Sequence, residues 1–167
     1  MNLAQYQKKV PSPPHSIWTN PIHFIACGFG IGSFPFFPGT LATLAAIPFT
    51  IIMLSHLTII LYFIVCAVLF FVGVYCCGVT NRDFKTDDHP TACFDEIATF
   101  PIVMAGVPCT WYFLLIGFLL FRFFDIVKPF PICWIDQNIH GGIGVMLDDL
   151  LAAIFSLVIL QGILILI

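Results

Sequence analysis

The chain has 167 residues, of which 60% are hydrophobic and only 9% are charged. An ordinary soluble domain carries about 25% charged residues, so this composition excludes a free soluble globule, a disordered chain and a collagen-like chain. A formal net charge of −3 without a basic cluster argues against nucleic acid as a partner. The length suits one domain with a single core.

Charged side chains are absent from three long stretches, residues 10–81, 97–121 and 150–167. Because a charged side chain inside a bilayer costs at least about 2.5 kcal/mol, such stretches are typical of membrane segments. All nine acidic residues fall within residues 82–96 and 122–149. These two windows are therefore the water-facing parts of the chain, where chemistry is expected.

The first part of the chain contains few residues that favour regular structure. Residues 1–20 carry several prolines and are expected to form a flexible tail, followed by one membrane-embedded domain over residues 21–167. Residues 21–27 predict a short apolar helix. Residues 28–39 hold four glycines and two prolines, which a regular helix interior does not tolerate, so we expect a loop.

Three segments are long enough to cross a membrane as helices. Thr40 is a candidate N-cap of the first, residues 40–57, and a turn at Ser55 and His56 joins it to the second, residues 58–79. Residues 147–167 form the last predicted span. The first two spans therefore predict a transmembrane hairpin.

A fourth apolar segment, residues 97–121, is interrupted by Pro101 and by the sequence Gly106-Val107-Pro108. We predict two half-length helices here, residues 91–107 and 110–124, packed as a hairpin that brings both acidic windows to one side of the membrane. The fold class is then all-α: a multi-pass integral membrane domain with about three full spans and a half-depth helical hairpin. All Lys and Arg residues fall on the same side, which predicts that this side is cytoplasmic.

Seven cysteines lie at scattered positions, several of them inside apolar runs, which argues against a disulfide framework. Cys76 and Arg82 have the Cys-x5-Arg spacing of cysteine phosphatases. The amides around Cys76 are expected to be bonded within an apolar helix and so are not available to wrap a phosphate. We therefore assign no catalytic role to this thiol.

The first candidate site is the adjacent pair Asp95 and Glu96, preceded by Asp87, Asp88 and His89. Neighbouring carboxylates at the start of a helix point about 100° apart and can bind a divalent cation or position water. The alternative is that these acids only complement the dipole of a helix N-terminus.

The second candidate site is the trio Arg122, Asp125 and Lys128, whose spacing places all three on one helical face. The donor fork of arginine and the point charge of lysine suit a phosphate, and Asp125 can join a metal site. The alternative is an ion pair that neutralises itself, with a lysine that reaches the membrane surface.

The third candidate site runs from Asp136 to the pair Asp148 and Asp149. The glycine-rich segment between them lets the backbone approach a ligand, and two adjacent carboxylates that enter a membrane require a neutralising cation. The glycine-rich loop of residues 28–40 is a weaker candidate for holding a phosphate at a helix N-terminus.

Together these sites favour a metal-assisted enzyme that acts on a phosphorylated substrate resident in the membrane, with Mg²⁺ as the cation. A small membrane transport or channel protein with a carboxylate-lined cation path is the alternative. Such a path predicts acidic residues spread through the depth of the membrane, whereas here they cluster at the ends of the predicted spans.

The segments GFGIGSFPFFPGTLATLAAIPF, FDE and FRFFDIVKPFPICWIDQNIHGGIGVMLDDLLAA resemble the phosphatidylglycerophosphatase A family over residues 20–153. The resemblance implies a multi-pass lipid phosphatase of phospholipid biosynthesis in the inner (cytoplasmic) membrane, with its active site facing the cytoplasm. Such an enzyme converts phosphatidylglycerophosphate to phosphatidylglycerol and inorganic phosphate and requires Mg²⁺. A CDP-alcohol phosphotransferase is a further alternative, but its DG-x2-AR pattern is absent.

The resemblance implies that water attacks phosphorus with the assistance of Mg²⁺. The positions that match the family receive the following roles in this reaction as hypotheses. The predicted metal ligands are Asp95, Glu96, Asp125, Asp148 and Asp149. The predicted catalytic residues are Asp88, His89, Arg122 and Lys128. The predicted substrate-binding residues are Gly39, Thr40, Asp136, His140, Gly141 and Gly142. The chain departs from the family pattern around the first acidic helix, at Asp87, Phe94 and Thr99.

Overall fold

The structure, a computed structural model, describes residues 14–86 and 89–166. Within these residues it contains helices and connecting segments but no strand, which confirms the all-α prediction. In chain order the elements are η1 (His15–Trp18), α2 (Pro21–Ala26), η2 (Gly28–Ser33), α3 (Pro38–His56), α4 (Ile59–Asp83), α5 (Phe94–Val103), α6 (Trp111–Val127), α7 (Ile132–Asn138) and α8 (Gly141–Leu166).

Three helices, α3, α4 and α8, are long and apolar enough to cross a membrane, which confirms the predicted number of full spans. Their outward surfaces carry large apolar side chains such as Ile60, Phe71 and Val158, which are 72%, 69% and 65% exposed. A helix that is apolar on its outer face as well as its inner face requires lipid around it. The protein is therefore a membrane protein.

Two of the spans begin earlier than predicted. α3 starts at Pro38, because proline is well tolerated in the first turn, and Phe37 rather than Thr40 occupies the N-cap position. The expected cap at Thr40 is thus wrong, and Thr40 lies inside the helix. α8 starts at Gly141, whereas the last span was predicted to begin at residue 147, so the helix includes the glycine-rich segment before that position.

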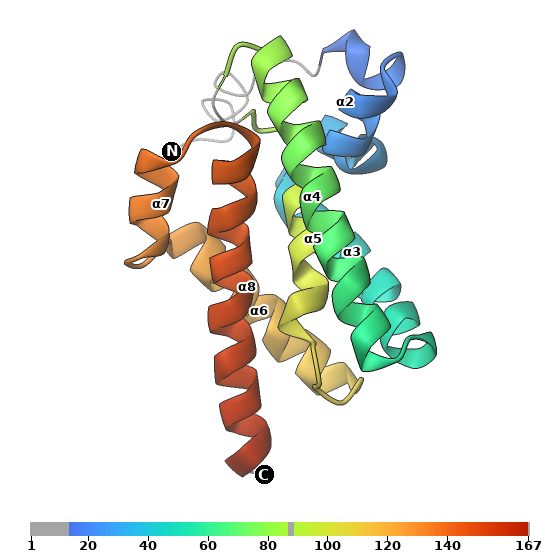
Figure 1. The fold of residues 1–167 in the computed structure, drawn as a ribbon, viewed down its shortest axis with the longest axis vertical. Coiled ribbons are helices and arrows are strands. Elements are labelled where there is room, and N and C mark those ends of the chain that lie inside the picture. Colours follow the sequence, from blue (N-terminus) through green and yellow to red (C-terminus); the bar gives the residue numbers. More distant parts are fainter. Residues whose placement is uncertain (1–13, 87–88, 167) are drawn as a thin grey trace.

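α5 and α6 form the predicted hairpin, with Gly106 in the turn at a φ of 70°. Neither helix is as long as the three spans. The hairpin nevertheless reaches the level of the turn between α3 and α4, because Ala105 packs in one cluster with Met53 and Tyr62. Figure 1 shows both turns at the same end of the molecule.

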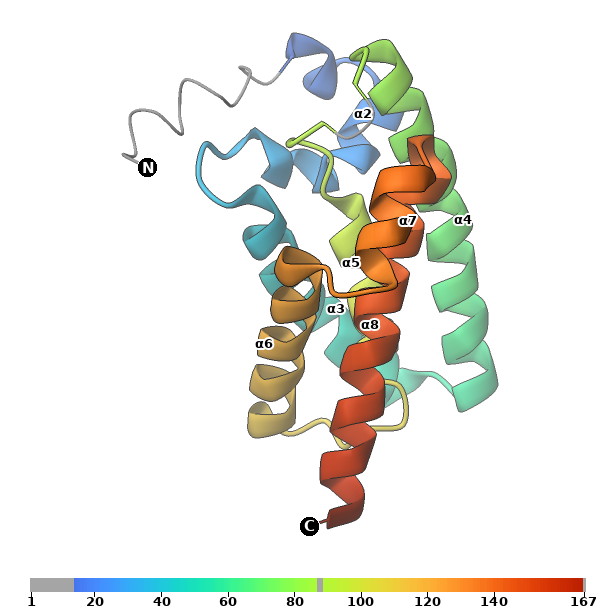
Figure 2. The same cartoon turned by 90° about the vertical axis from the view of Figure 1, so that its left-hand side faces the viewer.

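α5 lies at the centre of the bundle and packs against α3, α4 and α8, as Figures 1 and 2 show. Nearly all of its side chains are buried, and Phe100 contacts Phe121 of α6 edge to face. The hydroxyl of Tyr62 donates a hydrogen bond of 2.5 Å to the carbonyl of Pro101. α5 is therefore held in the middle of the surrounding helices.

The opposite end of the bundle, which we call the polar end, gathers α2, η2, α7, the C-terminal end of α4 and the start of α8 (Figures 1 and 2). The start of α5 and the end of α6 lie there too, so both acidic windows meet on one side as predicted. η1 lies within the segment expected to be a flexible tail, and its Ile17 is fully buried. Residues 1–13 of that segment lie outside the described residues.

Candidate active site

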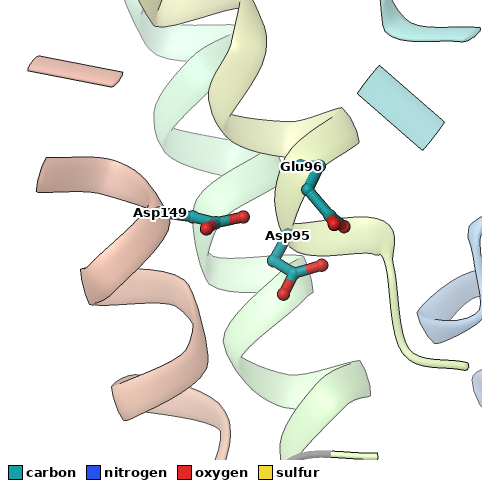
Figure 3. Close-up of side chains that lie close together, drawn as sticks. All are labelled: Asp95, Glu96 and Asp149. Atoms are coloured by element: carbon teal, nitrogen blue, oxygen red, sulfur yellow. The ribbon is translucent and has the colours of Figure 1, made fainter. Parts of the chain in front are cut away.

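Three carboxylates meet at the polar end, and we call them the acidic group: Asp95, Glu96 and Asp149. One ligand oxygen from each lies within 4.8 Å of the other two. The residues are 8%, 9% and 3% exposed, so all three carboxylates are removed from bulk water. Figure 3 shows that Asp95 and Glu96 come from the first turn of α5 and that Asp149 comes from α8.

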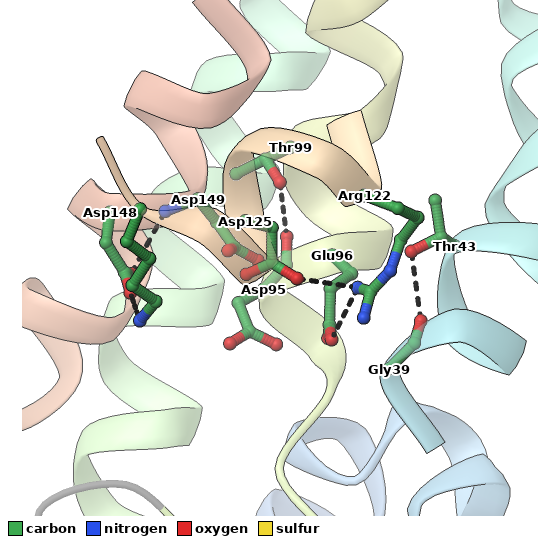
Figure 4. Close-up of polar contacts among 10 residues, drawn as sticks. Gly39, Thr43, Asp95, Glu96, Thr99, Arg122, Asp125, Asp148 and Asp149 are labelled. Atoms are coloured by element: carbon green, nitrogen blue, oxygen red, sulfur yellow. Dashed lines mark hydrogen bonds and ion pairs between the residues drawn. The ribbon is translucent and has the colours of Figure 1, made fainter. Parts of the chain in front are cut away.

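The central position of α5 explains how its two adjacent acids reach different neighbours. Consecutive helical residues project about 100° apart, so Asp95 lies beside α8 while Glu96 lies beside Arg122 of α6 (Figure 4). Asp149 lies beyond the first turns of α8 and is carried toward α5 by the packing of these two helices. Segments distant in sequence thus supply one compact group.

Arg122 is the cation beside the acidic group. Its Nη1 lies 2.8 Å from Asp125 Oδ2 and 3.5 Å from Glu96 Oε1. The ion pair with Asp125 follows from the predicted spacing of three residues on α6. Figure 4 shows Asp125 next to the acidic group, so the same guanidinium contacts Asp125 and one member of that group, Glu96.

The acidic group carries more negative charge than its surroundings compensate. Burial raises the pKa of Glu96 to about 8, and the charges of Asp149 and Asp125 add to this increase. Within the described part of the chain, Glu96 Oε2 and Asp149 Oδ2 are buried and accept no hydrogen bond. Buried carboxylate oxygens of this kind suit a hard divalent cation, so the donor set fits Mg²⁺.

Lys128 belongs to a second set of charges, which we call the lysine cluster: Lys128, Asp136 and Asp148. The ammonium lies 2.6 Å from Asp136 and 2.5 Å from Asp148. Burial lowers the pKa of Lys128, but Asp148 and Asp136 outweigh this effect and hold it above its ordinary value. The structure therefore places Lys128 with Asp148, and it does not bring Asp148 into the acidic group.

The two clusters adjoin each other through the backbone of α8. Asp148 Oδ1 accepts a hydrogen bond of 3.0 Å from the amide of Asp149. A small pocket of about 130 Å³ lies on the side of the lysine cluster, lined by Asp136, Ile139, His140, Gly141, Gly144, Val145 and Asp148. Three of the predicted substrate-binding residues, Asp136, His140 and Gly141, therefore share one pocket.

Gly142 has a different position from its neighbours. A side chain there would collide with the carbonyl of Val74 and with the backbone of Gly78, so Gly142 permits close contact between α8 and α4. Its lack of a side chain thus serves helix packing in the structure, and it does not line the pocket.

Gly39 lies at the acidic group, because a side chain on it would meet Glu96 Oε1 and Arg122 Nη1. The carbonyl of Gly39 accepts a hydrogen bond of 2.9 Å from Thr43, a buried residue that sequence reasoning missed. Thr40 is half-buried in the first turn of α3 and makes no side-chain hydrogen bond to the residues that the structure describes.

His89 lies in the segment that leads into α5, while Asp87 and Asp88 lie outside the described residues. It is 4% exposed, and its amide donates to Asn81 Oδ1 at 3.1 Å. Its ring nitrogen Nδ1 lies 2.7 Å from Thr91 Oγ1. Asn81 and Thr91 were not predicted; the signal that could have found Asn81 is an amide in the last turn of an otherwise apolar helix.

Cys76 is buried in the interior of α4, in a cluster with Phe94 and Met146. Its surroundings are apolar and belong to a regular helix, as expected. This position agrees with the assignment of no catalytic role to the thiol.

The chain matches known proteins over most of its length. A sequence model of the family described as phosphatidylglycerophosphatase A matches residues 24–164. Phosphatidylglycerophosphatase A of Haemophilus influenzae is 41% identical over 145 residues, which cover 86% of this chain and 89% of the relative. Phosphatidylglycerophosphatase A of Escherichia coli is 41% identical over 139 residues, which cover 83% and 80%.

No solved structure matches the chain. The family match covers α3 to α7 entirely and α8 almost to its end. It therefore includes both the acidic group and the lysine cluster. The chain belongs to the phosphatidylglycerophosphatase A family.

Proposed function

We propose that the protein hydrolyses the terminal phosphate ester of phosphatidylglycerophosphate and releases phosphatidylglycerol and inorganic phosphate. The observation that carries this proposal is the acidic group beside Arg122, at the end of three membrane-spanning helices. Relatives named for this activity are 41% identical to the chain over most of its length, which supports the same substrate here.

Asp95, Glu96 and Asp149 are the residues that would hold Mg²⁺, and Asp125 lies next to them. A bound Mg²⁺ neutralises phosphate charge and helps to activate water as the nucleophile. The support for this cation is that Glu96 Oε2 and Asp149 Oδ2 are buried and accept no hydrogen bond from the described residues. Asp148 is tied to Lys128 and contributes through the position of the neighbouring Asp149.

The remaining roles follow from the placement of the polar side chains. Arg122 can donate to the phosphoryl oxygens, where negative charge develops during the reaction. Gly39 leaves room at this point because it has no side chain. We place the hydroxyl groups of the substrate in the pocket lined by Asp136 and His140, which lies beside the lysine cluster.

We propose that the polar end faces the cytoplasm across the inner membrane. Arg82, Lys85, Arg122 and Lys128 all belong to elements at this end, as expected for cytoplasmic segments. Cysteines introduced at the exposed positions Thr86 and Gln137 should then react with an impermeant thiol reagent from the cytoplasmic side. The native Cys109, exposed near the opposite end, should react only from the other side. Labelling of Thr86→Cys and Gln137→Cys from opposite sides would overturn the shared site.

A transport function with a carboxylate-lined path is not favoured by the arrangement of the acids. The described acidic residues all belong to elements at the polar end, and the rest of each span contains none. A cation path would need polar groups along the depth of the membrane.

The proposed function is tested by phosphate release from phosphatidylglycerophosphate in detergent micelles, using purified protein with Mg²⁺ or with a chelator. We expect release with Mg²⁺ and its loss on chelation. An Asp149→Asn variant prepared in parallel controls for contaminating phosphatases. Release that is equal in the variant and the wild type would contradict the proposal.

A further inference from the structure

The hydrogen bonds around His89 define which of its ring nitrogens carries the proton. Two groups of Thr91 approach Nδ1: the amide nitrogen at 3.3 Å and the hydroxyl oxygen at 2.7 Å. An amide N–H can only donate, so Nδ1 must accept. A neutral imidazole that accepts at Nδ1 carries its proton on Nε2.

The thiol of Cys27 determines to which atom the Thr91 hydroxyl donates its hydrogen. Its Sγ donates to Thr91 Oγ1 at 3.7 Å, which leaves the Thr91 hydroxyl to donate its own hydrogen to His89 Nδ1. Burial raises the pKa of Cys27, so the thiol keeps the hydrogen that it donates. Burial also lowers the pKa of His89, which favours the neutral imidazole.

All three residues of this hydrogen-bonded series are fixed in place. Cys27, Thr91 and His89 are 0%, 2% and 4% exposed. The carbonyl of His89 accepts from the amide of Ala92 at 2.8 Å, which closes a turn directly before α5. Gly32 approaches the Thr91 backbone so closely that a side chain on it would collide with the Thr91 carbonyl. His89 is therefore held at a constant position relative to the first turn of α5.

The other ring nitrogen, Nε2, has no hydrogen-bond partner among residues 14–86 and 89–166. The ring also packs against Phe84, with centroids 4.8 Å apart, which limits its rotation. The one hydrogen-bond donor of the imidazole is thus left for a group outside the described protein residues.

We propose that Thr91 is a positioning residue for the phosphatase reaction: its amide and hydroxyl hold His89 with the proton on Nε2, so that His89 donates a hydrogen bond from Nε2 to an oxygen of the phosphorylated substrate. This inference rests on the proposed function for the identity of the substrate. The assignment of the proton to Nε2 depends only on the contacts of Thr91 and Cys27.

The position of the proton can be measured without activity. In protein labelled with ¹⁵N-histidine, the two ring nitrogens of His89, assigned by comparison with His89→Gln, should show the Nε2–H form. Thr91→Val removes the shorter of the two hydrogen bonds to Nδ1, from the hydroxyl at 2.7 Å, and leaves only the longer one from the amide at 3.3 Å. The Nδ1–H form should therefore become measurable beside the Nε2–H form in Thr91→Val, whereas Thr91→Ser should keep the Nε2–H form alone. A wild-type ring protonated on Nδ1, or a Thr91→Val ring that does not change, would overturn the proposal.

Kinetics with phosphatidylglycerophosphate test the role of the donor. Thr91→Val should lower kcat by about 10- to 100-fold with little change in KM, as expected for a misplaced catalytic group, and Thr91→Ser should keep most of the rate. Thr50→Val is the matched control, because Thr50 is also fully buried but, among the described residues, its hydroxyl donates only to the carbonyl of Ala46 in its own helix. An equal loss of rate in Thr91→Val and Thr50→Val would mean that Thr91 contributes only to packing, which would contradict the proposal.

Two substitutions of His89 distinguish its nitrogens. The amide nitrogen of glutamine reaches the position of Nε2, while that of asparagine reaches only the position of Nδ1. His89→Gln should therefore retain at least about tenfold more activity than His89→Asn, the value of one hydrogen bond. The reverse order would overturn the proposal. If wild type releases no phosphate at all, the proposed function fails, and the tautomer experiment still decides the role of Thr91.

Discussion

The acidic group and the lysine cluster lie side by side at the polar end, yet they differ in the balance of their charges. In the lysine cluster, one ammonium contacts both carboxylates directly, and Asp136 is 43% exposed to water. Beside the acidic group, Arg122 lies 3.5 Å from Glu96 and is shared with Asp125, at 2.8 Å. One cation thus serves two carboxylates in the lysine cluster, one of them open to water, whereas at the acidic group one cation lies beside three buried carboxylates and is also paired with Asp125.

Under the proposed function, this difference separates residues that stabilise the structure from residues that bind a cation. Lys128 ties the end of α6 to α7 and α8, because its two partners lie on those helices. The acidic group keeps buried oxygens that accept no hydrogen bond from the described residues, which is costly unless a cation is bound. Substitutions that remove one charge should therefore have opposite consequences in the two places.

The largest effect is expected for Asp149→Asn, which removes one charge with almost no change in volume. Phosphate release should fall by about 10²-fold or more, and the remaining activity should need more Mg²⁺. Without metal the variant should melt no lower than metal-free wild type, because repulsion between clustered carboxylates is relieved. Added Mg²⁺ should raise the melting temperature of wild type more than that of the variant.

Phosphate release and thermal unfolding, each with and without Mg²⁺, check this prediction. A variant that melts lower than wild type yet turns over with an unchanged Mg²⁺ requirement would mean that Asp149 only caps or pairs within the protein. That result would give the acidic group the same structural role as the lysine cluster and would contradict the proposed metal site.

The parts of this architecture that depend on local composition could be predicted from the sequence. Stretches without charge predicted the three spans, and Gly106 and Pro108 predicted the turn of the hairpin. The adjacent acids Asp95 and Glu96 were recognised because they stand directly before an apolar run. Each of these signals lies within a few residues of the feature that it predicts.

The split between the two clusters could not be predicted, because it depends on tertiary contacts. Helical spacing placed Lys128 on one face with Arg122, but α6 ends at Val127 and Lys128 adopts a left-handed conformation with φ of 45°. Its side chain therefore turns to α7 and α8. The early start of α8 was missed for a similar reason. Gly142 is needed for contact with α4, whereas several glycines close together disfavour a helix when only the sequence is considered.

Arg122→Lys tests the cation that lies beside the acidic group. The charge remains, but the planar fork that can bind both Asp125 and a phosphoryl oxygen is lost. We expect kcat to fall by about 10²-fold, the usual effect of losing one donor to a developing charge, with little change in melting temperature. Steady-state kinetics and thermal unfolding measure both. Wild-type turnover in Arg122→Lys would show that this residue has only a structural role.

Lys128→Met should act mainly on stability. It leaves Asp148, which is 7% exposed, without its cation, and a buried charge that loses its partner is destabilising. The melting temperature should fall, and the loss of rate should stay below that of Arg122→Lys. Because the pKa of Lys128 is raised in the folded protein, its contribution is complete below the ordinary lysine pKa and disappears only as the pH rises above it.

The difference in melting temperature between wild type and Lys128→Met should therefore stay constant between about pH 6 and pH 9, well below the ordinary lysine pKa of about 10.4. Unfolding curves across this range provide the measurement. An Arg122→Lys protein that melts lower than Lys128→Met would reverse the roles assigned to the two clusters.

The smallest effect is expected for Asp136→Asn, which makes the same chemical change as Asp149→Asn at the exposed side of the lysine cluster. Exposed ion pairs contribute at most about 1 kcal/mol, and Lys128 keeps its contact with Asp148, so the melting temperature should change little. If Asp136 accepts a hydrogen bond from the substrate, KM should rise by about tenfold or less while kcat stays near the wild-type value. Kinetics on both variants in the same detergent give a direct comparison. A loss of kcat in Asp136→Asn as large as that in Asp149→Asn would place the reaction at the lysine cluster, because only a group next to the reacting phosphate can affect kcat so strongly through a single charge.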